Sequence, residues 1–110
     1  MLMHIDENRI RKQYNKLIGM INEVVGEWEI WIEGCPINPL RVKVVRIRRG
    51  SYLGEANYLI QNPTQFEPYR SVHYPHKTVQ EALEEAIKGF MTFYDPKTKE
   101  QTKYILVENF

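Results

Sequence analysis

The sequence has little of several features that would define a class of protein at once. A single cysteine, Cys35, excludes an intramolecular disulfide and any metal site built on several cysteines. No apolar run approaches the roughly 20 residues that cross a bilayer, and the first residues lack the basic start and apolar stretch of a signal peptide. Internal repeats and low-complexity segments are also absent. We therefore expect a soluble, cytoplasmic protein that does not bind membranes.

Neither sign of charge dominates. Lysine and arginine number 15 and the acidic residues 14, which gives a net charge of +1. This balance argues against a generally basic nucleic-acid binder, although a local basic face stays open. A chain of 110 residues, 43% of them hydrophobic, fills one core and has no room for a second. We expect a single domain over residues 1–110.

Two segments have the pattern of amphipathic helices. Asp6 is a typical N-cap, and apolar residues recur at helical spacing from Ile10 to Val25, which predicts a first helix that ends at Gly26. The second helix begins with a capping box over residues 78–81, in which a threonine and a glutamate each satisfy a free backbone donor of the other. Its apolar stripe continues to a stop at residues 95–96, Asp-Pro.

The segments between and after the helices alternate as strands do. Strands are expected at residues 27–33, 41–49, 52–61 and 104–107, separated by turns rich in glycine, proline and asparagine. The element order is then α-β-β-β-α-β. Since the strands alternate apolar and polar residues, they suit a sheet with one wet face. We expect an α+β fold, with an antiparallel sheet of three to four strands and both helices packed on one face.

The strand at 41–49 is the most basic part of the chain, with five cations and no acid. Its alternation slips once, at Val44-Val45. If it forms a hairpin with residues 27–33, a β-bulge at this pair keeps Arg46 out of the core. The expected cross-strand neighbours are Glu33 with Arg41, Trp31 with Lys43, Glu29 with Arg46 and Glu27 with Arg48.

Two interpretations of this basic strand are open. In the first, the glutamates of the neighbouring strand neutralise the cations, and the strand is a solvated, charge-paired part of the sheet. In the second, the cations are free for phosphate groups and an aromatic ring stacks on a base, as nucleic-acid binding requires. The candidate nucleic-acid contacts are Arg41, Lys43, Arg46, Arg48 and Arg49.

Exposed aromatic residues are the other candidates for binding. Trp31 is expected on the polar face of the sheet, where a tryptophan can dock a partner. The loop at 62–77 has sixteen residues, longer than most connections, and such loops are commonly functional. Alternatively, its aromatic residues cover the open end of the core. The candidate residues in the loop are Phe66, Tyr69, Arg70, His73 and Tyr74.

Patterns of catalytic or metal-binding residues are sparse. His73 and His76 have no third ligand at a recognisable spacing, and Cys35 lies in a connecting loop with nothing nearby in sequence to activate it. We expect no cofactor, no metal and no catalytic residue. The sequence favours a non-catalytic domain that binds a partner protein or forms a homodimer, with nucleic-acid binding as the alternative.

Overall fold

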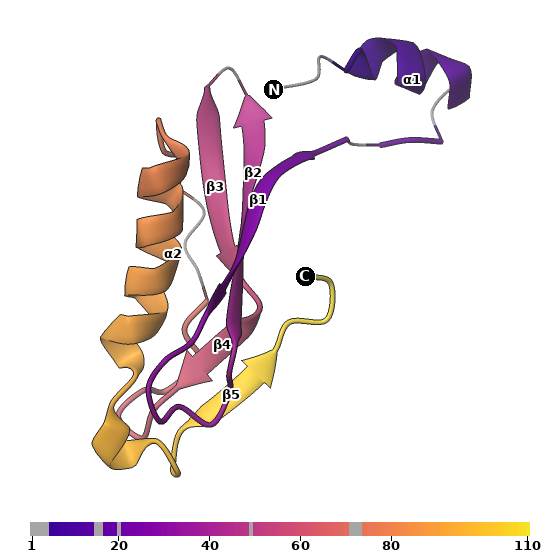
Figure 1. The fold of residues 1–110 in the computed structure, drawn as a ribbon. Helices are drawn as coiled ribbons and strands as arrows, with labels where there is room; N and C mark the ends of the chain where they lie inside the picture. Colours follow the sequence, from indigo (N-terminus) through magenta and orange to yellow (C-terminus); the bar gives the residue numbers. More distant parts are fainter. Residues whose placement is uncertain (1–4, 15–16, 20, 49, 71–73) are drawn as a thin grey trace.

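The computed structural model describes residues 5–14, 17–19, 21–48, 50–70 and 74–110, and it confirms the α+β class (Figure 1). Antiparallel strands form a three-stranded sheet and a two-stranded sheet, and a helix packs on the larger one. The elements are α1 (Glu7–Tyr14), β1 (Glu23–Ile30), β2 (Leu40–Arg48), β3 (Ser51–Ala56), β4 (Tyr58–Gln61), α2 (Val79–Phe93), the 3₁₀ turn η1 (Pro96–Thr98) and β5 (Lys103–Leu106).

The strand expected at 52–61 is divided at Asn57, and the division separates the two sheets. Asn57 is buried, and its side-chain Oδ1 accepts the backbone N–H of Arg41 at 2.9 Å. Its own N–H donates to the Arg41 carbonyl, and its carbonyl accepts the N–H of Val107. A bend at Asn57 therefore directs the chain from β3, which pairs with β2, into β4, which pairs with β5.

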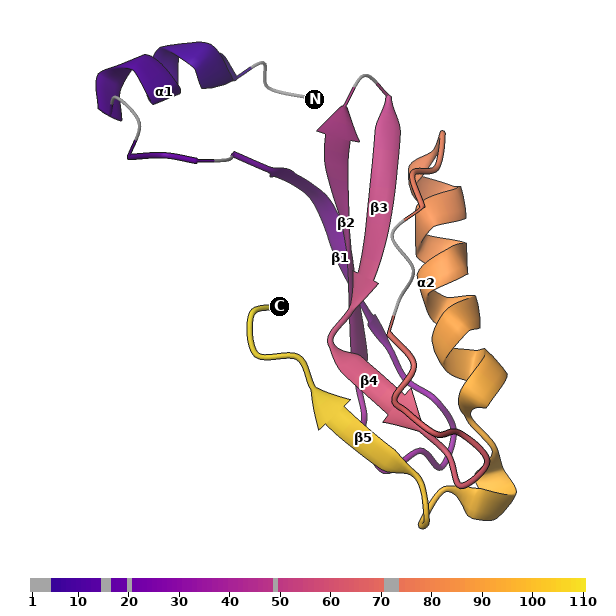
Figure 2. The ribbon, with the colours of Figure 1, turned by 180° about the vertical axis from the view of Figure 1, so that it is seen from behind.

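Helix α2 forms as the sequence predicts and lies along β3 and β2 (Figures 1 and 2). The Thr78 hydroxyl accepts the N–H of Glu81 at 3.1 Å, as expected for an N-cap. The helix approaches β3 closely because Gly54 has no side chain. A Cβ there would overlap the carbonyl oxygen of Ala82 and lie 3.1 Å from the Cβ of Ala86. Phe90, further along the same face, is fully buried in the core with Leu40, Val42, Val44 and Ile60.

The first helix is shorter than predicted. The Asp6 cap is present, with the N–H of Arg9 bonded to its carboxylate at 3.1 Å, but α1 ends at Tyr14. Residues 23–26 belong to β1, which suits the β-branched pair Val24-Val25. Positions 15, 16 and 20 of the predicted helix lie outside the described residues.

Helix α1 also does not pack on the sheet beside α2. None of its residues is buried, and in both views it stands apart from the strands at the end of an extended segment (Figures 1 and 2). The radius of gyration, 16.5 Å, exceeds the value of about 13 Å for a compact domain of this length. We call the described residues 5–14, 17–19, 21 and 22 the N-terminal arm.

The pairing of β1 with β2 differs from the predicted register by four residues at Arg41 and Lys43 and by six at Arg46, which lies opposite Glu23. Arg41 lies opposite Glu29 and not Glu33, and Lys43 lies opposite Glu27. Strand β1 ends at Ile30 because the side chain of Asn38 holds Ile32 in the following loop. The amide oxygen of Asn38 accepts the N–H of Ile32, and its amide nitrogen donates to the C=O of Ile32. Residues 31–39 therefore form the loop between β1 and β2, and β2 pairs with residues nearer the N-terminus than predicted.

The predicted β-bulge lies in the other strand. Val24 pairs with Val45 and Gly26 with Val44, so the extra residue is Val25 of β1, across from the expected position. A second irregularity follows Arg46 near the end of β2. The break in apolar-polar alternation at Val44-Val45 of β2 is thus matched by a bulge in the neighbouring strand β1.

Replacing the buried Asn57 by alanine leaves the N–H of Arg41, in a partly buried position, without its acceptor. We expect the free energy of unfolding to fall by about 1–3 kcal/mol, the range for a donor that loses its acceptor away from water. Urea denaturation followed by circular dichroism measures it. Asn8→Ala, at an exposed position of α1, is the control and should change stability by less than about 0.5 kcal/mol. Equal effects of the two substitutions would contradict the role given to Asn57.

Gly54→Ala should loosen the contact between α2 and β3. Since backbone and not a flexible side chain occupies the space, we expect a loss of about 1–3 kcal/mol by the same measurement. Gly19→Ala is the matched control, because nothing lies within 4 Å of a Cβ at that position. A Gly54→Ala variant as stable as the parent would show that α2 does not pack this closely.

Candidate binding surfaces

Three cations of the basic strand β2 have glutamate neighbours, each at 3.7 Å. Arg41 pairs with Glu29 of β1, and Lys43 pairs with Glu55 of β3. Arg46 pairs with Glu23, the first residue of β1. Charge pairing was expected for Arg41 with Glu33 and for Arg46 with Glu29, whereas Lys43 was expected opposite Trp31. At these three positions a carboxylate therefore neutralises part of the charge that a phosphate group would meet.

Lys43 is covered more completely than the sequence suggests. Its Nζ donates to the backbone oxygen of Phe110 at 2.8 Å and lies 4.7 Å from the centre of the Phe110 ring. Only 18% of its side chain is exposed. The contact joins residues 67 positions apart, so no local pattern predicts it. Trp31, the neighbour expected for Lys43, lies beyond the end of β1.

The remaining basic candidates contribute less. Arg46 lies over the ring of Tyr52, with 5.8 Å from its guanidinium carbon to the ring centre. Half of the Arg41 side chain is exposed. The side chain of Arg48 and the whole of Arg49 lie outside the described part of the chain. The described cations of β2 thus contact side chains of the neighbouring strands β1 and β3.

Trp31 is 68% exposed, as a binding residue must be. It follows β1 directly, at the start of the 31–39 loop. It therefore lies beside the end of an edge strand and not in the middle of a polar sheet face.

The described part of the 62–77 loop folds back along the strands. Tyr69 exchanges backbone hydrogen bonds with Ile60 of β4 at 2.7 and 3.4 Å, and His76 exchanges them with Tyr52 of β3 at 2.8 and 2.9 Å. The ring of Tyr69 packs against Phe93 with 4.8 Å between ring centres. Tyr69 thus packs against the core, as one of the two interpretations expects.

Other residues of the loop face solvent. Phe66 is fully exposed, Tyr74 is 65% exposed, and Arg70 is exposed as well. His73 lies outside the described residues. The loop candidates therefore divide into a packing residue, Tyr69, and three surface residues.

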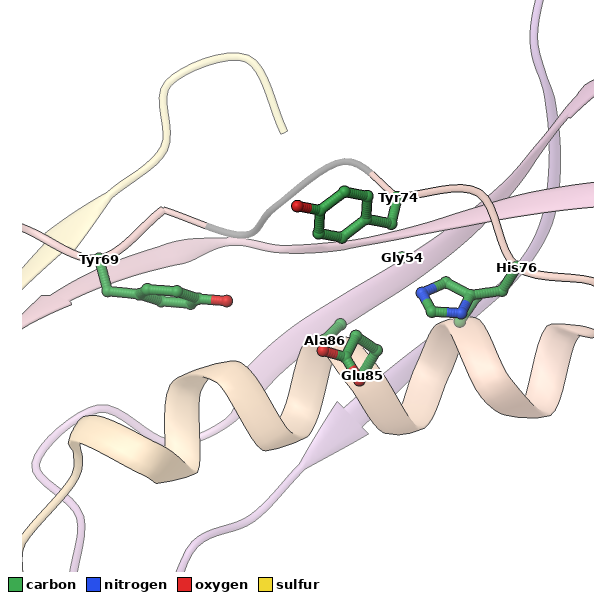
Figure 3. A pocket seen from close by; sticks show the side chains of 7 residues that line it. Gly54, Tyr69, Tyr74, His76, Glu85 and Ala86 are labelled. Carbon is green, nitrogen blue, oxygen red and sulfur yellow. The ribbon is translucent and has the colours of Figure 1, made fainter.

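A small pocket lies between the loop and α2 (Figure 3). Tyr69, Tyr74 and His76 border it from the loop, and Glu85 borders it from the helix. Its volume is about 10 Å³, which is room for roughly one water molecule. These polar side chains surround a space too small for an organic substrate.

The buried thiol of Cys35 lies among tyrosines and has no disulfide partner. Burial raises the pKa of Tyr104 to about 12, with a further contribution from Cys35, and burial raises the pKa of Tyr94 as well. The Tyr104 hydroxyl donates to the Lys99 carbonyl at 3.2 Å. Within the residues that the structure describes, no three His, Cys, Asp or Glu side chains gather as metal ligands would.

The N-terminal arm is a surface that the sequence patterns assigned to the core. Ile5, Tyr14 and Leu17 are 56%, 52% and 85% exposed. An open groove of about 660 Å³ separates α1 from the tip of the β2–β3 hairpin. Its lining includes Glu7 and Arg11 from the helix, Ile21 from the rest of the arm, and Ile47 and Pro75 from the body.

Comparison with models of protein families, with curated proteins and with solved structures gives no match. Among the helices in the described ranges, none has both the length and the apolar character that crossing a membrane requires.

The raised pKa of Tyr104 predicts a pH dependence of stability. The neutral phenol is favoured in the folded state, so its contribution is complete below pH 10 and is lost as the pH rises towards 12. We expect Tyr104→Phe to be less stable at pH 7, where it lacks the hydrogen bond to Lys99, and to lose less stability above pH 10.

Urea titrations between pH 7 and 11.5 measure this difference. Tyr14→Phe, on the exposed helix α1, is the control and should follow the parent curve. Parallel curves for the parent and Tyr104→Phe would contradict the shift.

Proposed function

We propose that this protein is a non-catalytic protein-binding or self-associating module. The observation that carries the proposal is the exposed N-terminal arm. Its apolar residues recur at helical spacing, yet none of those with described side chains is fully buried within one chain, and Ile5, Tyr14 and Leu17 are exposed. Small domains seldom leave a large apolar surface exposed unless another surface covers it.

The pocket bordered by His76 and Glu85 holds about one water molecule and is too small for an organic substrate. Nucleic-acid binding, the alternative, stays a prediction with less support, because Arg41, Lys43 and Arg46 each have a carboxylate within 4 Å.

A cytoplasmic location belongs to the same proposal, and the unpaired, buried Cys35 supports it.

Self-association through the arm can be tested by sedimentation equilibrium over a range of concentrations. We expect a mass about twice the 13.1 kDa of one chain. The double substitution Tyr14→Ser with Leu17→Ser should restore the monomer. It should leave unfolding within about 0.5 kcal/mol of the parent, because both side chains are exposed in the single chain.

Leu106→Ser is the matched control, since Leu106 is also an exposed apolar residue but lies on β5 and is not a candidate binding residue. It should associate as the parent does. A parent chain that stays monomeric at every concentration, with no difference among the variants, would contradict self-association through the arm.

A further inference from the structure

Strand β1 is an open edge of the three-stranded sheet. It pairs with β2 on one side only, and among the described residues no backbone group bonds to its outer side. The opposite edge differs, because Tyr52 of β3 bonds to His76 of the loop. β1 is eight residues long, whereas β5, which also pairs on one side only, has four. An unpaired edge of this length is a template for another strand.

The hydrogen bonds of Arg41 show which backbone groups of β1 point outwards. The N–H and C=O of Arg41 both bond to Asn57, away from β1. Its partner Glu29 therefore stands in a non-hydrogen-bonded pair, and its own N–H and C=O face the free edge. Because the pattern repeats every two residues, the same holds for Glu27. Both residues offer a donor and an acceptor to an added strand.

The side chains along this edge differ in chemistry between the two faces of the sheet. On one face, Glu27 and Glu29 are exposed, and Glu27 has no cation within 4.0 Å among the described residues. On the other face, Trp28 and Ile30 are only partly buried, because α2 packs over β3 and β2. A strand beside β1 would thus meet carboxylates on one face and apolar groups on the other.

We propose that the outer edge of β1 binds an extended segment of a partner protein in which basic and apolar residues alternate. The segment adds a fourth strand to the sheet, with main-chain bonds to Glu27 and Glu29 and its cations beside their carboxylates. The inference rests on the proposed function and names the class of partner. The chain itself supplies a precedent, because β2 pairs with the inner side of β1 through the same alternation of Arg41, Val42 and Lys43.

A second copy of this chain fits the edge poorly. In an antiparallel pair of β1 strands, the residues whose N–H and C=O face the free edge must lie opposite the same kind of residue in the other copy. Glu27 and Glu29 would then face each other across the interface, and like charges directly opposite destabilise a sheet. The edge therefore favours a partner of opposite charge, whereas self-association involves the arm.

The test uses a nine-residue peptide with the sequence of β2, Leu40–Arg48, and the full-length protein. Isothermal titration calorimetry measures affinity, and amide hydrogen exchange by NMR locates the binding. We expect one peptide per chain and slower exchange at Glu27 and Glu29. The control peptide has the same composition with its basic and apolar residues in separate blocks, and should bind at least about ten-fold more weakly.

Two substitutions at Glu27 separate the backbone from the charge. Glu27→Pro removes the outward N–H without breaking a bond to β2, and an edge strand tolerates proline at such a position. We expect it to weaken peptide binding at least about ten-fold. Glu27→Gln keeps the N–H and removes the charge, and should weaken binding by about two- to five-fold. Circular dichroism and urea denaturation confirm that each variant is folded.

Equal affinity for the two peptides, or unchanged exchange at Glu27 and Glu29 with the β2 peptide in excess, would overturn the inference. A Glu27→Gln variant that no longer binds the β2 peptide at all would show that charge alone attracts the peptide, and this result would also overturn the inference. If the chain self-associates but binds no peptide up to about 1 mM, the inference fails and the proposed function stands. If it does neither, both fail.

Discussion

The arrangement of both sheets depends on the hydrogen bonds of one buried residue, Asn57. Its side chain accepts the N–H of Arg41 in β2, while its backbone carbonyl accepts the N–H of Val107 just after β5. An amide group without partners in this buried position would destabilise the fold by about 1–3 kcal/mol. The bonds fix the bend between β3 and β4, and β4 then places Ile60 against Phe90 in the core. Without this bend, the sheet of β4 and β5 would not cover the end of the core around Phe90.

The elements that the sequence predicts best are those with local causes. Helix α2 was predictable because its cap, its apolar stripe and its stop all lie within about twenty residues. The end of the first helix was not, since Val24-Val25 fits either a helical or a strand pattern. The register of the hairpin was also missed, because it depends on the Asn38 side chain closing the loop. Residues 54–57, Gly-Glu-Ala-Asn, are types depleted in strands, so a break there could have been predicted, but the sequence does not show that the chain continues into a second sheet.

The same distinction holds for the candidate surfaces. Charge pairing along β2 was foreseeable from the alternating glutamates, but the contact of Lys43 with Phe110 joins distant parts of the chain and was not. Because Arg41, Lys43 and Arg46 each pair with a glutamate of a neighbouring strand, the described charge of β2 says more about architecture than about function. The outer side of β1 and the exposed face of α1 are left without partners in the described chain, and binding is expected there.

Hydrogen exchange under mild denaturant tests most directly whether Asn57 joins the two sheets into one cooperative unit. The amides of Arg41, which bonds to the Asn57 side chain, and of Val107, which bonds to its carbonyl, report on the two sides of the bend. If the bend is part of the core, both amides open with the same free energy and the same dependence on denaturant. If Val107 and the β4–β5 pair instead open at much lower free energy and without denaturant dependence, the smaller sheet is an independent appendage and the central role of Asn57 is contradicted.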